Sequence, residues 1–168
     1  ASNLCSEITL PADEDHSFTC VLSSLNMAYY DEWDDDLPFV ATVFLDAVCQ
    51  EFIECAKNIK GLEKAVRFTR KARALGLGVM GYHTAMIKKG FIWGSLDELL
   101  WNNMVFGSIK REAIRASEYI ADHFGEPEWM QGTGRANSHL LAIEPTKSTA
   151  LIMGGVSEGI SPVSAYVY

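Results

Sequence analysis

Short apolar segments alternate with longer helical segments along this 168-residue chain, and that alternation constrains the fold more than any other feature. The apolar segments have the length of strands, and the segments between them repeat apolar residues every three or four positions, as helices do. Strands are expected at the start of FTCVLSSLNMAYY (18–30), within LGLGVM (75–80) and at SHLLAI (138–143), and helices at 39–58, 62–74 and 95–124. Strands separated by helices predict an α/β fold with a largely parallel sheet. Too few strands are visible to close a barrel, so either the sheet is open or the rest of it lies on another polypeptide.

The helix expected at 39–58 is strongly apolar and carries two of the four cysteines, Cys49 and Cys55. Its apolar residues recur at helical spacing at Val40, Val43, Phe44, Ala47, Val48 and Phe52. Cys55 shares a stripe with Val48, and both cysteines are therefore predicted to be core residues. Six residues of helix rise about 9 Å, too far for a disulfide between them. The cysteine spacing is irregular, and reduced thiols with structural or catalytic roles are expected.

The helix that begins near residue 95 has a recognisable start. Ser95 and Glu98 fit a capping box, in which a serine hydroxyl bonds the backbone N–H three residues later. The apolar pattern continues through Ile120 to Gly125. A break into two pieces at Gly107 is an open alternative.

Gly76, Gly78 and Gly81 have the GxGxxG spacing of dinucleotide-binding loops. That motif needs a strand before it, whereas the preceding residues here form a basic helical pattern. The pattern favours a short buried strand in which glycines let neighbouring backbone approach closely. His83, just beyond it, is expected to be a satisfied interior histidine.

The opening SNLCSEI places three unlike polar side chains, Asn3, Cys5 and Glu7, on one face if the segment is extended. A thiolate nucleophile is disfavoured, because Glu7 would raise the pKa of the thiol. A zinc site using Cys5, His16 and Cys20 would lack the close ligand pair of structural zinc sites. Hydrogen-atom abstraction by a sulfur radical needs no thiolate, and a neighbouring carboxylate could take a proton from the same substrate.

PTKSTA (145–150) follows the expected strand 138–143 directly. Thr146, Ser148 and Thr149 offer hydroxyls and backbone N–H groups to an anion, and Lys147 adds positive charge. An ordinary helix N-cap is the alternative interpretation.

Four stretches, SNLCSEI, FTCVLSSLN, GTGRANSHLLAIEPTKSTA and GVSEGISP, occur in an order that resembles the catalytic large subunit of ribonucleotide reductase. The resemblance is to the class I enzymes, those of bacteria and bacteriophages included. It implies that 1–168 is a single partial domain, the second half of a ten-stranded α/β barrel with the active-site finger loop at its N-terminus. The N-terminal half and the C-terminal tail of the subunit would be absent. The implied activity is reduction of ribonucleoside diphosphates to deoxyribonucleoside diphosphates by thiyl-radical chemistry, and the isolated chain is not expected to turn over.

The resemblance also implies residue roles. Cys5 would become the thiyl radical that removes the 3′ hydrogen, Glu7 would deprotonate the 3′ hydroxyl, and Asn3 would hydrogen-bond the sugar. Cys20 would be one of the redox-active disulfide pair, with its partner upstream. The substrate phosphates would be held by Pro145, Thr146, Lys147, Ser148 and Thr149.

No cofactor or metal is expected to bind this chain directly, since the radical would come from a metal-containing small subunit. The other implied partners are the N-terminal half of the large subunit, thioredoxin or glutaredoxin as reductant, and further copies in an oligomer. A net charge of −8 argues against nucleic-acid binding, and no apolar run is long enough to span a membrane. The location expected is the cytoplasm, of the host if the gene is a phage's. The alternatives are an adenosylcobalamin-dependent (class II) reductase and an inactive fragment with only an assembly role.

Overall fold

The computed structural model describes residue 2 and residues 8–163 of the chain. In chain order the elements are β1 (Val21–Asn26), the 3-10 helix η1 (Met27–Glu32), α1 (Leu37–Ala56), α2 (Glu63–Ala72), β2 (Leu75–Met80), α3 (Tyr82–Lys89), α4 (Leu96–Phe124), the 3-10 helix η2 (Glu128–Met130) and α5 (Lys147–Ile152).

The sheet is parallel, as the alternation of strands and helices predicts. β1 and β2 pair side by side, with Val21 opposite Leu75 and Asn26 opposite Met80. α1 and α2 connect them, because parallel neighbours need a long crossover. Both strands are confirmed at the places where the sequence predicted them.

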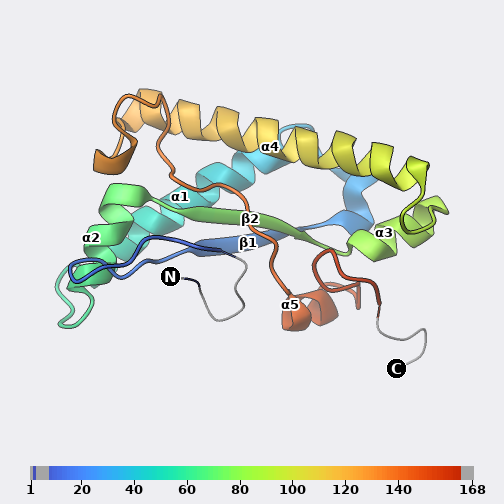
Figure 1. Ribbon diagram of the computed structural model, residues 1–168, viewed down its shortest axis with the longest axis horizontal. Coiled ribbons are helices and arrows are strands. Elements are labelled where there is room, and N and C mark those ends of the chain that lie inside the picture. Colours follow the sequence, from blue (N-terminus) through green and yellow to red (C-terminus); the bar gives the residue numbers. More distant parts are fainter. Residues whose placement is uncertain (1, 3–7, 164–168) are drawn as a thin grey trace.

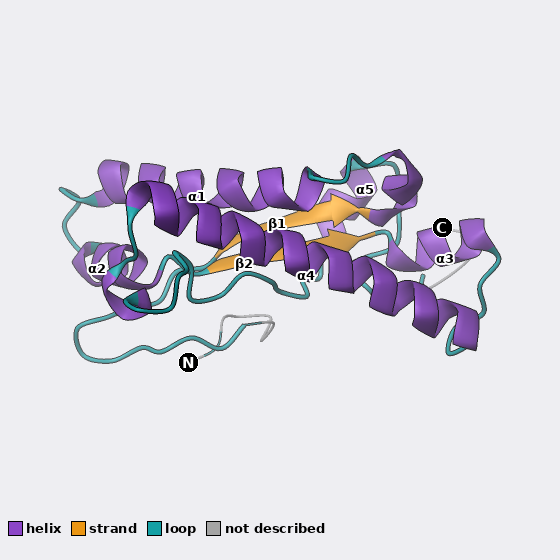
Figure 2. Cartoon of the chain, turned by 90° about the horizontal axis from the view of Figure 1, so that it is seen from above, coloured by secondary structure: helices purple, strands orange, loops and turns teal. Residues whose placement is uncertain are grey.

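Helices α1 and α4 cover one face of this sheet, while α5 lies on its other side (Figure 1, Figure 2). The side chains of Leu25, Leu75, Leu77 and Val79 pack into a single core with residues of both covering helices. Every residue of β2 is buried, which is typical of a strand inside a parallel sheet. The opposite face of the sheet carries Ser24 of β1 and the two glycines of β2, Gly76 and Gly78.

The sequence predicted the wrong buried side for α1. Phe44 is 64% exposed and Val48 36% exposed, whereas Leu45, Cys49 and Ile53 are buried. Cys49 is thus confirmed as a core cysteine, but the prediction for Cys55 is wrong, since Cys55 is exposed and its thiol donates to Glu51. The helix is apolar on two sides, so periodicity could not decide which side meets the sheet.

α4 is a continuous helix of 29 residues. Ser95 caps it by accepting a hydrogen bond from the backbone N–H of Glu98 at 3.2 Å, which confirms the predicted start. Gly107 does not break it, and a side chain there would meet no atom within 4 Å. Among the described residues, no helix is both long and apolar enough to cross a membrane.

The segment 138–143 forms an extended edge alongside β2 but only part of a strand. Leu75 N donates to His139 O at 2.9 Å, Leu77 N to Leu140 O at 2.8 Å, and Ala142 N to Leu77 O at 3.2 Å. These bonds give a single parallel bridge between Leu77 and Leu141. The predicted strand is therefore confirmed in position but is shorter and less regular than expected.

Candidate functional site

Two glycines of β2, Gly76 and Gly78, let neighbouring atoms approach closely on the sheet face that α1 and α4 do not cover. A Cβ on Gly76 would stand 2.9 Å from the Cβ of Ala142 and 3.3 Å from the sulfur of Cys20. Cys20 immediately precedes β1, so its thiol lies on this face, beside the edge segment. The glycines serve close backbone approach, as expected. Gly76 and Gly78 lie inside β2 and not in the turn between β2 and α3, so the three glycines do not form a dinucleotide-binding loop.

A carboxylate lies further along the same face. Ser24 donates a hydrogen bond of 2.5 Å to Glu144, which is 7% exposed. A Cβ on Gly78 would be 2.5 Å from the backbone oxygen of Ala142 and 3.5 Å from Oε1 of Glu144. Cys20 and Glu144 therefore belong to one surface, with Glu144 next to the turn predicted to bind phosphate.

That turn begins with an unusual backbone conformation. Thr146 has φ 50° and ψ 23°, a left-handed conformation that is rare for a β-branched residue. Its hydroxyl makes no capping bond to α5 and instead accepts from the backbone N–H of Gly159 at 2.8 Å. The simple side-chain N-cap interpretation is thus wrong, and the first turn of α5 has no side-chain cap. Lys147, Ser148 and Thr149 are exposed there.

The GVSEGISP segment holds this turn against α3. Gly159 has φ +49°, and a Cβ on it would be 2.4 Å from the carbonyl oxygen of Glu144, so only glycine fits. Ser157 and Thr84 exchange backbone-to-hydroxyl bonds of 2.9 and 3.2 Å. The turn is therefore fixed on both sides by residues distant in the sequence.

The three expected catalytic side chains, Asn3, Cys5 and Glu7, lie outside the described residues. The described segment that follows them starts at Ile8, which is buried in a cluster with Leu10 and Phe68. Cys20 packs at the edge of that cluster.

No disulfide joins the described cysteines, Cys20, Cys49 and Cys55. Burial raises the pKa of Cys49 to about 12, so this thiol is protonated at neutral pH. The pKa of Cys55 is also raised, because its thiol is hydrogen-bonded to the Glu51 carboxylate. Neither is suited to thiolate chemistry.

The two histidines named in the sequence analysis, His83 and His16, both have hydrogen-bond partners. The ring Nδ1 of His83 accepts from the backbone N–H of Val163 at 3.1 Å, which confirms a satisfied histidine. His16 bonds Asp13 and packs against Trp129. Within the described part of the chain, no group of three or more His, Cys, Asp or Glu side chains could hold a metal ion. The alternative zinc site includes Cys5 and so reaches beyond the described residues.

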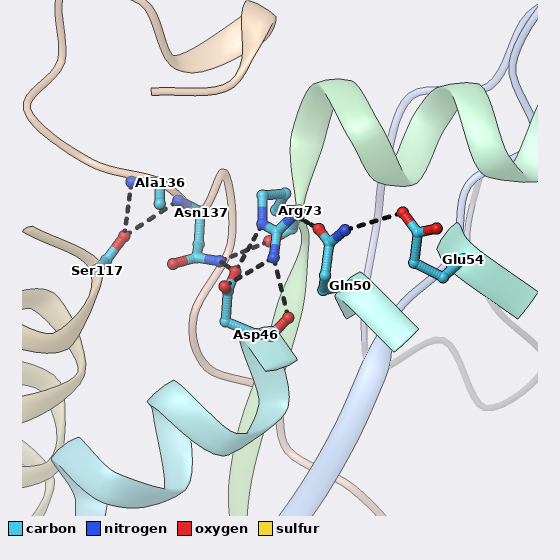
Figure 3. A network of polar contacts seen from close by, with 7 residues as sticks. All are labelled: Asp46, Gln50, Glu54, Arg73, Ser117, Ala136 and Asn137. Atoms are coloured by element: carbon cyan, nitrogen blue, oxygen red, sulfur yellow. Dashed lines mark hydrogen bonds and ion pairs between the residues drawn. The ribbon is translucent and has the colours of Figure 1, made fainter. Parts of the chain in front are cut away.

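A buried polar network was missed by the sequence reasoning (Figure 3). Arg73 donates to both carboxylate oxygens of Asp46, at 2.8 and 2.7 Å. Asn137 Nδ2 donates to Asp46 Oδ1 at 2.8 Å and to the carbonyl of Arg73 at 3.0 Å. Ser117 Oγ accepts from the backbone N–H groups of Ala136 and Asn137 at 3.1 and 3.0 Å. One signal could have found it: Asp46 interrupts the apolar run FVATVFLDAVC, and a charge in a buried run needs a partner.

The network pairs the positive charge of Arg73 with the negative charge of Asp46. Burial alone would lower the pKa of Arg73, but its hydrogen bonds to Asp46 and the charge of that carboxylate outweigh burial and raise it. The guanidinium therefore stays charged against a carboxylate that is 7% exposed.

A parallel sheet with α1 and α4 on one face, and a thiol and a constrained turn on the other, defines an α/β domain with its site on the face that α1 and α4 leave uncovered. Comparison with known proteins identifies the domain. The chain belongs to the ribonucleotide reductase barrel-domain family, whose family model, "Ribonucleotide reductase, barrel domain", matches residues 1–133.

Three relatives illustrate the match. The alpha subunit of a class Id ribonucleotide reductase from Actinobacillus ureae is 44% identical and superposes on the whole chain with a TM-score of 0.97, over 32% of its own length. The ribonucleoside-diphosphate reductase large subunit of Invertebrate iridescent virus 3 is 37% identical over 99% of the chain and 26% of its own length. A vitamin B12-dependent ribonucleoside-diphosphate reductase from Thermoplasma acidophilum is 30% identical over the whole chain and 22% of its own length. The chain thus spans about a fifth to a third of the length of these three relatives.

Proposed function

We propose that this chain is the part of a class I ribonucleotide reductase large subunit that carries the reducing face of the active site. The substrate would be a ribonucleoside diphosphate and the product the corresponding deoxyribonucleoside diphosphate. The observation that carries the proposal is the agreement with the class Id alpha subunit over the entire chain, at 44% identity. Cys20 and the turn at 144–149 lie on the same face of the sheet, which supports the proposal.

The proposed chemistry divides between two sulfur roles. Cys5, as a thiyl radical, would take the hydrogen atom from C3′ of the ribose, and Glu7 would accept the proton of the 3′ hydroxyl. The 2′ hydroxyl would leave as water. Cys20 and a second thiol would supply two electrons and two protons and become a disulfide, and the hydrogen atom would return to C3′. A dithiol protein would then reduce that disulfide.

Phosphate binding at the turn is supported by its charge and its backbone. Lys147 supplies the positive charge, and the uncapped first turn of α5 presents backbone N–H groups. Asn3 would hydrogen-bond the sugar between this turn and Cys5. Pro145 and Thr146 would shape the turn, while Ser148 and Thr149 would offer hydroxyls to the phosphates.

The radical would come from a metal-containing small subunit, and the remaining part of the large subunit would complete the barrel and supply the partner of Cys20. Thioredoxin or glutaredoxin would serve as reductant in an oligomeric, cytoplasmic enzyme. The match to a vitamin B12-dependent reductase supports one alternative, in which adenosylcobalamin replaces the small subunit.

The test is deoxyribonucleotide formation by this chain assembled with the rest of a large subunit, a radical-generating small subunit and a dithiol reductant. We expect turnover that disappears in Cys5→Ser and Cys20→Ser and persists in Cys55→Ser, because Cys55 is exposed on the outer side of α1. Turnover that needs adenosylcobalamin and ignores the small subunit would support the alternative. No turnover from a folded, fully assembled complex, with or without added adenosylcobalamin, would contradict both.

A further inference from the structure

We propose that Asn137 is a positioning residue for the substrate-binding turn, acting through the register of the 138–144 segment on β2. The inference rests on the proposed function, because it assigns the substrate's phosphates to residues 145–149. The segment that carries the turn is held on β2 by only three backbone hydrogen bonds.

The register of this segment decides which side chains face the site. Ala142 lies so close to Gly76 and Gly78 that a Cβ on either glycine would collide with it, while Leu141 and Ile143, which alternate with it along the segment, are exposed. A slip by one residue would exchange the two faces, because side chains alternate along an extended segment. It would bring a large side chain onto the glycines and turn Glu144 away from Ser24.

Asn137 fixes the start of the segment with three further hydrogen bonds, as many as the ladder to β2 provides. Its side chain is 2% exposed and donates to groups from two other elements, Asp46 on α1 and the carbonyl of Arg73 at the end of α2. Its backbone N–H donates to Ser117 on α4. Three helices that are distant in sequence therefore converge on one residue, immediately before the segment that leads to the turn (Figure 3).

Three details point to a specific role for the side-chain amide of Asn137. Both partners of Nδ2 are acceptors, so the amide cannot be reversed without placing its oxygen against them. The Oδ1 atom of Asn137 is buried and has no hydrogen-bond partner among the described residues. Such an atom is costly, and a buried leucine or alanine would avoid that cost. Arg73 also holds a left-handed conformation, φ 42°, and its carbonyl accepts from the amide.

The test compares Asn137→Ala and Asn137→Asp with Ile53→Ala in the assembled reductase. Asn137→Asp is nearly isosteric but replaces the donor with an acceptor facing Asp46. Ile53 is the matched control, because it is equally buried but packs in a separate cluster between α1 and α2, with Ala56 and Val66. Thermal melting of all three variants shows whether the losses of stability are comparable.

We expect both Asn137 variants to lower kcat/KM by up to about 100-fold, mainly through a higher KM for the diphosphate, since small misplacements of binding groups are costly. Hydrogen exchange at the amides of Leu77 and Ala142 should accelerate in these variants and stay unchanged in Ile53→Ala. A KM that rises equally in Ile53→Ala, or unchanged exchange at those two amides, would overturn the inference. Absence of turnover in the wild-type assembly would instead overturn the proposed function.

Discussion

Replacing Gly78 by alanine should destabilise the chain, although alanine is normally favoured over glycine. The usual gain comes from a less flexible unfolded chain and is about 0.4–1 kcal/mol. In this strand, however, the new Cβ would stand 2.5 Å from the backbone oxygen of Ala142. An ordinary van der Waals contact begins at 3.4 Å, so the edge segment must move by about 0.9 Å.

The cost of that movement exceeds the gain. The atom in the way belongs to the backbone and cannot rotate aside, so overpacking costs about 1–3 kcal/mol. The displaced residue also donates one of the three bonds to β2, from Ala142 N to Leu77 O, and weakening it costs about 1 kcal/mol. We therefore expect a net loss of about 1–3 kcal/mol in the free energy of unfolding.

Gly107→Ala is the matched control. It lies in the interior of α4 with no atom within 4 Å of the added carbon, so it should stabilise by about 0.5–1 kcal/mol. Urea denaturation of the purified chain, followed by circular dichroism, measures both. A loss of 2 kcal/mol lowers the urea midpoint by about 1 M at a typical m-value. Equal stabilisation by the two alanines would refute the close approach of the edge segment to β2.

Asp46→Ala should lower the free energy of unfolding by about 3–5 kcal/mol, since it leaves the charge of Arg73 buried without its carboxylate. The same urea titration checks this, and a loss below 1 kcal/mol would mean that water reaches the guanidinium. Ser95→Ala should cost about 1 kcal/mol through loss of the hydrogen bond to the Glu98 N–H, measured as a lower melting temperature; no change would argue against the cap. The buried thiol of Cys49 predicts a pH dependence: its pKa in the folded chain, about 12, lies above that of an unfolded thiol. The folded state thus keeps a proton that the unfolded state loses, and stability should fall by up to about 1.4 kcal/mol per pH unit between pH 9 and 12. Cys49→Ala should reduce that slope in denaturation at a series of pH values, and an identical slope would contradict the assigned pKa.

The sequence by itself determined the local structure and the residue types of the proposed site. The apolar run LGLGVM predicted a buried strand, and Ser95 and Glu98 predicted the start of α4, because both signals depend only on residues close in the chain. The family resemblance rested on four short stretches, and the family comparison confirmed it. The roles of Asn3, Cys5 and Glu7 stay predictions, because these residues lie outside the described part.

Tertiary structure decided what depends on contacts between distant residues. The buried side of α1 could not be read from its sequence, because the helix is apolar on two sides and only the sheet selects one. The segment 138–143 became a partial edge strand because the two glycines of β2 admit Ala142. Asp46 bonds Arg73 and Asn137 across 27 and 91 positions of the chain. The spacing of residues within one helix does not indicate which distant residues they will contact. The network that anchors the candidate site therefore exists only once the chain has folded.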